Sequence, residues 1–235
     1  KTIINYQQAF QRISSSLNEL KTHKDWSDFY IKMLYWEMEL EGLDDLAMLE
    51  IFQNQMKEAN RLFAKYVQNH YQDWIVYQSG PLMSHQILKK KLFPILKNGS
   101  NKTTLMVVID NLRFDQWKII APIIENHFQK EEEISYFSIL PTATQYARNA
   151  IFSGMMPLEM QINHSELWVD ENEKVGKNLN EEAFLKSQLQ RNSINCQFSY
   201  SKITNLKAGR ELTQSLSNHK NDDLVVVVYN FVDMI

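Results

Sequence analysis

Thr144 is the residue of this chain whose position most favours chemistry. It stands where a helix is expected to begin, after the apolar run 134–140 and a break at Pro141-Thr142. A helix N-terminus has unsatisfied backbone N–H groups and carries the positive end of the helix dipole. A hydroxyl in this position suits the binding of phosphate or the stabilisation of an alkoxide nucleophile. The alternative is that Thr144 is an ordinary N-cap threonine.

Neighbours on the same helix extend the candidate site towards an anion. Arg148 follows Thr144 by four residues, which is about one helical turn, so the two side chains share a face. A guanidinium group suits phosphate or sulfate oxygens because it donates through a planar fork. We therefore expect Arg148 to hold the phosphate and Asn149 to add an amide donor. Tyr146 is either a stacking platform for a base or a packing residue.

Two aspartates stand at the ends of apolar runs. Asp110 ends one such run, and Asp233 closes a segment that contains four consecutive valines at 225–228. Open α/β sheets bind ligands at the carboxyl ends of their strands. Asp110 is either a metal ligand or an acid that caps the next loop or pairs with Arg113. Together with Thr144, the two aspartates offer oxygen ligands for hard or borderline cations, zinc included.

The second half of the chain has the alternation of elements that is typical of a parallel sheet covered by helices. Strands are expected at 104–110, 134–140, 195–200 and 223–230, and helices at about 115–128, 144–153, 181–192 and 208–218. The predicted fold of residues 104–235 is therefore α/β, with helices on both faces of a sheet.

Residues 1–78 predict a three-helix bundle. One apolar stripe with helical spacing runs over 6–20, Asp25 is expected to cap a second helix, and a third apolar face runs over 46–66. Short turns between such helices favour antiparallel packing. Residues 79–103 are expected to form a connecting helix and a polar linker.

Composition narrows the class of protein and its compartment. The net charge of -3 argues against a nonspecific nucleic-acid binder. Cys196 is the only cysteine, which rules out an intrachain disulfide and fits a reducing compartment. No signal peptide is visible in this sequence and no apolar run approaches about 18 residues, so a cytoplasmic location without membrane contact is expected. Because the chain starts at Lys1 and stops at Ile235 directly after a strand, we expect a fragment of a longer polypeptide.

The segment from Pro141 to Gly154 resembles the nucleophile segment of the alkaline phosphatase superfamily, especially its nucleotide pyrophosphatase/phosphodiesterase branch. That branch has a Pro-Thr-x-Thr motif with a glycine ten residues after the second threonine, and the second threonine is the nucleophile. The resemblance implies that Thr144 attacks a phosphodiester. This chain departs from the branch at Ala147-Arg148, where the branch has Asn-His, and Arg148 is expected to replace the missing donor.

The same resemblance implies a two-metal site. Asp110 matches the metal aspartate of the first strand, and Asp233 matches an aspartate that a metal histidine follows four residues later. Two zinc ions are implied: Asp110 and Thr144 would bind one, and Asp233 the other. The remaining ligands, an Asp-His pair and two further histidines, would lie beyond Ile235.

Longer matches extend the resemblance over nearly the whole chain. Segments 109–117, 141–157 and 228–233 resemble the PglZ domain, and the helical bundle resembles the middle of PorX-type response regulators of Bacteroidetes. The resemblance implies a phosphodiesterase output domain that acts on nucleotides or oligonucleotides and controls type IX secretion and gliding. It also implies a sensor histidine kinase as partner, through a receiver domain, and a possible homodimer. The alternative is a non-enzymatic signalling or dimerisation module with a vestigial metal site.

Overall fold

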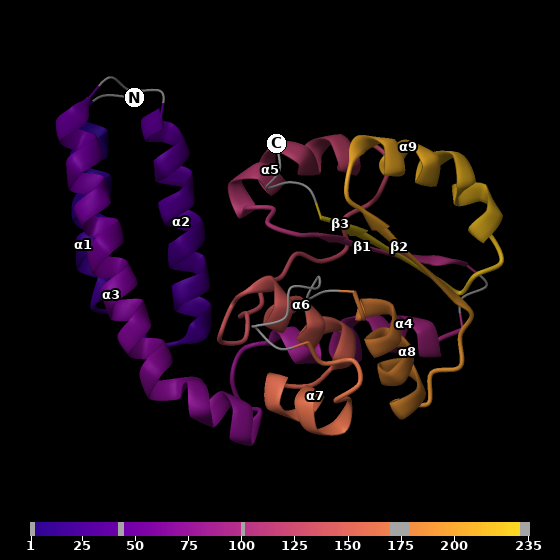
Figure 1. Ribbon diagram of the computed structural model, residues 1–235. Coiled ribbons are helices and arrows are strands. Elements are labelled where there is room, and N and C mark those ends of the chain that lie inside the picture. The colour runs from indigo at the N-terminus through magenta and orange to yellow at the C-terminus, as the bar shows by residue number, and fades with distance from the viewer. Residues whose placement is uncertain (1–2, 42–44, 100–101, 170–178, 231–235) are drawn as a thin grey trace. The chain divides into compact units, whose positions relative to one another are not determined.

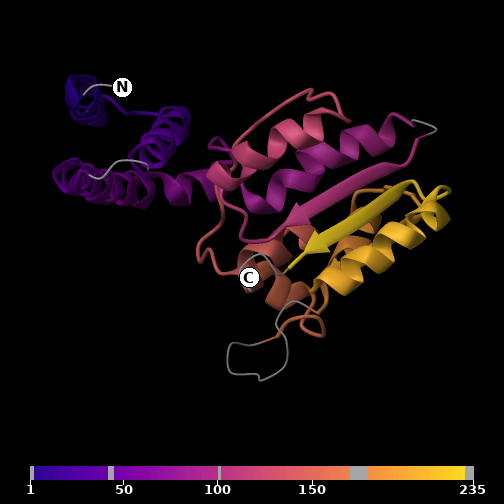
Figure 2. The same cartoon turned by 90° about the horizontal axis from the view of Figure 1, so that it is seen from above.

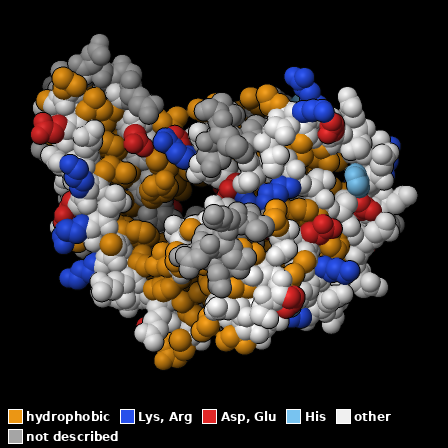
Figure 3. Space-filling view, in the orientation of Figure 1, with side chains coloured by type: hydrophobic (Ala, Val, Ile, Leu, Met, Phe, Trp, Pro, Cys, Tyr) orange, Lys and Arg blue, Asp and Glu red, His pale blue; other side chains and the backbone are white. Residues whose placement is uncertain are grey.

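The computed structural model describes residues 3–41, 45–99, 102–169 and 179–230. The chain forms two compact units: Lys1–Pro81 with Arg113–Ser135, and Leu82–Leu112 with Tyr136–Ile235. The boundaries predicted at residues 78 and 103 stay predictions. On the face drawn in Figure 3, basic and acidic side chains are interspersed, in keeping with the small net charge.

The first unit contains the expected bundle of three helices (Figure 1). These are α1 (Ile3–Leu17), α2 (His23–Glu41) and α3 (Leu46–Tyr77). Their buried side chains form one apolar cluster, which comprises Tyr6, Phe10, Ile13, Leu17, Trp26, Phe29, Met33, Leu40, Met48, Phe52 and Ala59. A fourth helix of this unit, α5 (Phe114–Glu125), packs against α2.

The cap of α2 differs from the prediction. Asp25 lies inside the first turn of α2, and its carboxylate accepts hydrogen bonds from the backbone N–H groups of Thr22 (2.8 Å) and Lys21 (3.1 Å). The Thr22 hydroxyl accepts in return from the Asp25 backbone N–H at 3.1 Å. This reciprocal pair is a capping box, so the prediction of Asp25 as the cap was wrong by three residues. On α3 the side chain of Asp45 does cap the helix, accepting from the Met48 N–H.

The second unit is built on a parallel sheet of three strands. The strands are β1 (Thr104–Ile109), β2 (Phe198–Ile203) and β3 (Leu224–Tyr229), in the order β1-β3-β2. The register pairs Ile109 and Ile203 with Tyr229, so all three strands end at one level. Figure 2 shows β1 and β3 running side by side in the same direction.

Helices of the second unit cover both faces of this sheet, as predicted (Figure 1). The helix α9 (Leu206–Ser215) packs on the face that carries Val225 and Val227. The opposite face is covered by α6 (Thr144–Ser153) and α8 (Glu181–Arg191), where Phe152 meets the ring of Tyr200 edge-on. Two short helices, α4 (Phe93–Lys97) and α7 (Pro157–Asn163), complete the unit, with single-turn helical segments at Ser84–Gln86, Leu88–Leu92 and Leu216–His219. In the described part of the chain, no helix has the length and apolar character that crossing a membrane requires.

The prediction of a strand at 134–140 was wrong. This segment makes a single isolated bridge, between Phe137 and Met83, and Ile134, Tyr136 and Leu140 are each close to half exposed. Alternating apolar residues favour a strand, but a strand also needs a continuous partner to satisfy its backbone groups. The strand predicted at 195–200 exists, three residues later than expected.

Candidate active site

Asp110 lies at the carboxyl edge of the sheet. It comes directly after β1, and its backbone N–H donates to the carbonyl of Tyr229 at 2.9 Å. Asn230 comes directly after β3, and its N–H donates to the carbonyl of Ile203 at 2.8 Å. These backbone bonds fix both residues at the edge where open α/β sheets place ligands.

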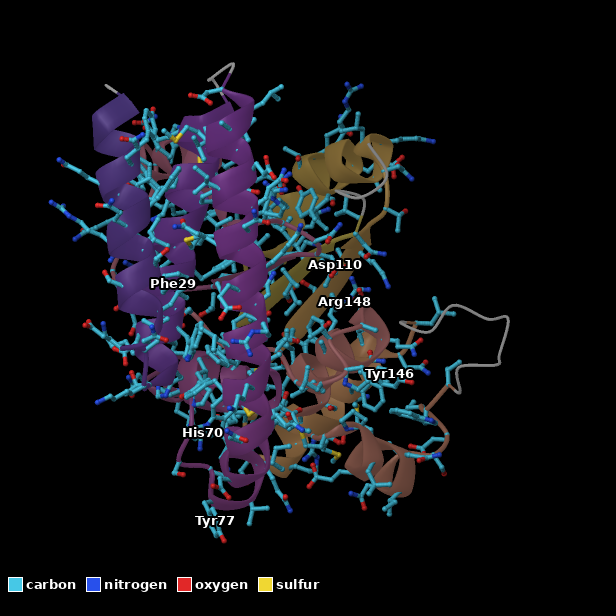
Figure 4. All side chains as sticks on the ribbon, turned by 90° about the vertical axis from the view of Figure 1, so that its left-hand side faces the viewer. Phe29, His70, Tyr77, Asp110, Tyr146 and Arg148 are labelled. Carbon is cyan, nitrogen blue, oxygen red and sulfur yellow. The ribbon has the colours of Figure 1, made fainter. Side chains whose placement is uncertain are left out.

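Arg148 connects α6 to this edge. Its Nη1 lies 2.8 Å from Oδ2 of Asp110 and donates to Oδ1 of Asn230 at 2.7 Å. Its Nε donates to Oε1 of Glu181, the first residue of α8. The Arg148 side chain is 3% exposed, and Figure 4 shows Arg148 and Asp110 close together. The guanidinium group thus joins helices α6 and α8 to the ends of β1 and β3.

Glu181 is the most buried charge of this network. Its side chain is 1% exposed, and its Oε2 accepts a hydrogen bond from the hydroxyl of Tyr200 and lies 3.3 Å from Nζ of Lys202. Burial, and then the charge of Glu181, raises the pKa of Tyr200, so its hydroxyl stays protonated and donates. The negative charges of Glu181 and Asp110 are matched by the positive charges of Arg148 and Lys202. This pairing offsets the free-energy cost of removing the charged groups from water.

Thr144 opens α6 without capping it. The N-cap is Ala143, with no side-chain cap bond, and the half-buried Thr144 is the first helical residue. Among the described residues, none makes a hydrogen bond to the Thr144 hydroxyl. The alternative interpretation, an ordinary N-cap threonine, therefore does not describe this side chain.

The other predicted neighbours on α6 are engaged in their own surroundings. Asn149 is buried, and its amide donates to the carbonyl of Gln145 at 2.8 Å, back into the same helix. Tyr146 stacks on Trp168, with ring centroids 6.0 Å apart and planes inclined by 30°. This tyrosine has a packing partner, and Figure 4 shows it on the same helix as Arg148.

The candidate metal ligands lie only partly within the described residues. Asp110 and Thr144 are oxygen donors of the kind that zinc and harder cations accept. Asp233 lies outside the described residues. Within residues 3–41, 45–99, 102–169 and 179–230, no three His, Cys, Asp or Glu side chains gather as a metal site. The described donors fit the implied metal in chemistry, and the roles of the predicted site residues stay predictions.

The sequence did not predict four residues of the polar network as part of the candidate site: Glu181, Tyr200, Lys202 and Asn230. Asn230 could have been predicted, because it directly follows an apolar strand as Asp110 does. Glu181 carried none, because an acid in the first turn of a helix is common on protein surfaces. Tyr200 and Lys202 alternate on one face of β2, but that pattern alone does not indicate which acid they meet.

Comparisons with known protein families agree with this architecture. Residues 87–235 match the family described as the BREX system PglZ alkaline phosphatase-like domain. Residues 1–75 match the PorX response regulator linker domain. None of the curated proteins compared with the chain matches it. PglZ domains belong to the alkaline phosphatase superfamily, which supports the assignment of residues 87–235 to the broad class of hydrolases. The chain therefore belongs to the PglZ alkaline phosphatase-like family, and the linker of a PorX-type response regulator precedes its PglZ domain.

Proposed function

We propose that the PglZ domain is a metal-dependent phosphodiesterase that cleaves nucleotide or oligonucleotide phosphodiesters. The observation that carries this proposal is the state of Thr144. Its hydroxyl is at the N-terminus of α6, is not used as a cap, and has no hydrogen-bond partner in the described part of the chain. A side chain that stabilises no neighbour at a site of positive potential suits a nucleophile.

In this mechanism Oγ of Thr144 bonds to phosphorus while the leaving alkoxide departs on the opposite side. The hydroxyl proton passes to solvent, and water then hydrolyses the phosphothreonine ester. The positive end of the α6 dipole would hold a non-bridging oxygen. Asp110 and Thr144 would hold one zinc ion and Asp233 the other. Bound zinc supplies Lewis-acid chemistry, which lowers the pKa of the hydroxyl and stabilises the leaving oxygen.

Arg148 has two roles to weigh in this mechanism. The role expected from the sequence is a direct grip on the phosphate, with Asn149 as a further donor. A guanidinium that is 3% exposed would first have to leave Asp110, Asn230 and Glu181 to do so. Its contacts support a different role, in which Arg148 orients Asp110 from behind.

We also propose the setting that the two matched families suggest. The phosphodiesterase would be the output of a cytoplasmic two-component response regulator, which a sensor histidine kinase addresses through a receiver domain. Its output would control type IX secretion and gliding. The support for this setting is the PorX response regulator linker domain at residues 1–75.

A second candidate function is a non-enzymatic signalling module that dimerises. One observation favours it: Ile31, Tyr35 and Met38 follow each other at helical spacing on α2 and are 38%, 49% and 40% exposed. An apolar stripe of this kind is suited to a second copy of the helix. Catalysis distinguishes the two functions, because only the phosphodiesterase hydrolyses a substrate.

The test compares Thr144→Ala with Thr142→Ala, a matched control two residues earlier. The protein to be assayed is a longer chain, called the extended chain below. It contains residues 1–235 and the histidines that the family resemblance implies after Ile235. Hydrolysis of bis-p-nitrophenyl phosphate and of a dinucleotide is measured with zinc present. We expect Thr144→Ala to lose turnover on the order of 10³-fold or more at an unchanged melting temperature, and Thr142→Ala to keep it. Wild-type turnover in Thr144→Ala would contradict the role of Thr144 as nucleophile, and no turnover in the wild-type protein with zinc present would contradict the proposed activity and favour the signalling module.

A further inference from the structure

We propose that Glu181 is a positioning residue for the candidate active site and acts on Asp110 through Arg148. This inference rests on the proposed function, in which Asp110 is a metal ligand. Glu181 is not a catalytic residue in this scheme. It belongs to a different helix from Thr144 and Arg148, and its carboxylate is turned towards Arg148 and the strand β2.

The geometry of the guanidinium group makes this coupling specific. Nε of Arg148 donates to Oε1 of Glu181, whereas Nη1 faces Oδ2 of Asp110 at 2.8 Å. Because the guanidinium is planar and rigid, fixing the direction of Nε also fixes the direction of Nη1. Glu181 therefore fixes the orientation of the guanidinium plane of Arg148, and this orientation determines where Nη1 contacts Asp110.

Glu181 is itself anchored on the sheet. Its other oxygen, Oε2, accepts from the Tyr200 hydroxyl and lies 3.3 Å from Nζ of Lys202. Tyr200 and Lys202 are alternate residues of β2, so they project from the same face of the strand. Contacts thus run without a break from β2 through Glu181 and Arg148 to the residue that follows β1.

Charge gives Glu181 a second effect on Asp110. Arg148 is shared between the carboxylates of Glu181 and Asp110. Without the charge of Glu181, Asp110 alone would neutralise a guanidinium that is 3% exposed. Asp110 would then be a weaker ligand for a cation, because its negative charge would be committed to Arg148. Buried ion pairs add little net stability, so the orientation of Asp110 explains this network better than stability does.

Three variants separate the positioning role from a structural one. Glu181→Gln removes the charge that Arg148 meets. Tyr200→Phe is the matched control, because it removes one of the two contacts of Oε2, whereas Lys202 still lies beside Oε2 and Oε1 keeps its contact with Arg148. Glu181→Asp keeps the charge but shortens its reach, and it replaces Glu181→Gln if that variant fails to fold.

The first measurement needs no metal. In the 235-residue chain, NMR follows the Nε–H signal of Arg148 and its exchange with solvent. We expect slow exchange in the wild type and in Tyr200→Phe, and exchange at least about 10-fold faster in Glu181→Gln or Glu181→Asp, because the charge-assisted hydrogen bond from Nε is weakened by loss of the charge or by the shorter side chain. Equal exchange in all of these proteins would overturn the proposed path through Arg148.

The second measurement is zinc affinity of the extended chain, in competition with a chromophoric chelator. Residues that orient a metal ligand typically change affinity by about 10–100-fold, and we expect Glu181→Gln to weaken zinc binding by this factor. Tyr200→Phe should weaken it by less than about 3-fold, since the Arg148 contact is kept. Adding Glu181→Gln to Asp110→Asn should produce no further loss, because Glu181 acts only through Asp110.

The outcomes distinguish this inference from the function on which it rests. If the wild type binds zinc and Glu181→Gln binds it equally well, the positioning role is overturned and the proposed function remains. Additive losses in the double variant would also overturn it, because Glu181 would then act by another route. If the wild type binds no zinc, the proposed function fails, and the role of Glu181 fails with it.

Discussion

Arg148 and Asp110 form an ion pair of 2.8 Å between a helix and the end of a strand, with side chains that are 3% and 21% exposed. The pair links α6, the helix that begins with the candidate nucleophile Thr144, to the candidate metal ligand Asp110. Thr144 is four residues before Arg148 on α6, and Asp110 follows β1 directly. Any change that frees Arg148 is therefore expected to affect both the stability of the second unit and the position of Asp110.

The first prediction is that Arg148→Met strongly destabilises the second unit. Removal of the guanidinium leaves Glu181 buried without its partner, and breaking a buried pair in this way costs about 3–5 kcal/mol. Urea denaturation of the 235-residue chain measures the change.

A matched control is Arg61→Met, because Arg61 and Glu58 form a pair in which both side chains are exposed. We expect this variant to keep nearly the wild-type stability. Equal stability of Arg148→Met and the wild type would show that Glu181 and Asp110 find other partners when Arg148 is lost.

Local patterns predicted all four helices expected in residues 104–235 and three of the four strands, with β1 and β3 placed within one residue at each end. The periodicity of apolar residues placed α6 at 144–153, as the structure has it, and placed α8 within one residue. It failed at 134–140, because a strand depends on a partner that is distant in sequence. For the same reason β2 begins three residues later than expected: its register is set by pairing with β3.

The candidate site likewise combines features that follow from local sequence with a contact between residues that are distant in sequence. The position of Asp110 after a strand and that of Thr144 at a helix start are local properties, and both were predicted. The contact between Arg148 and Glu181 joins two helices that lie far apart in the sequence, and no spacing rule indicates it. The sequence therefore favoured a phosphate as the partner of Arg148, because no local pattern indicates that Glu181 and Asp110 lie beside its guanidinium group.

A second prediction concerns Gly154, which ends α6 with φ of 67°. A Cβ at this position would lie 2.2 Å from the side-chain amide of Gln188, which is buried. Gly154→Ala adds this clash to the strain of a left-handed backbone, and we expect a loss of about 2–4 kcal/mol in the free energy of unfolding.

Gly99 provides the control for the backbone contribution alone. Its φ is 61°, and a Cβ there would meet nothing within 4 Å. Gly99→Ala should therefore cost only about 1–2 kcal/mol. If both variants lose the same stability in urea denaturation, the contact with Gln188 contributes nothing.

A third prediction concerns the thiol of Cys196. Burial, and then the charge of Asp223, raises the pKa of this thiol above its ordinary value. Because the thiolate is the reactive form, we expect Cys196 to react with iodoacetamide more slowly than a free cysteine at pH 7.5. The rate should rise to that of free cysteine when the chain is unfolded in urea. Equal rates in the folded and unfolded chain would show that burial in the folded chain does not slow the reaction of Cys196.

The last prediction concerns His85, whose burial lowers the pKa of its imidazole below 6.5, with Glu159 acting in the opposite direction and Lys90 in the same one. In the unfolded chain this histidine takes up a proton near its ordinary pKa, whereas in the folded chain it does not. The unfolded state then binds more protons, so the free energy of unfolding falls as the pH drops below about 6.5. Urea denaturation between pH 7.5 and pH 5.5 should show this fall, and His85→Leu should make it shallower, whereas His127→Leu, at an exposed position, should retain it. A pH dependence that is identical in His85→Leu and the wild type would mean that other groups account for all of the acid sensitivity.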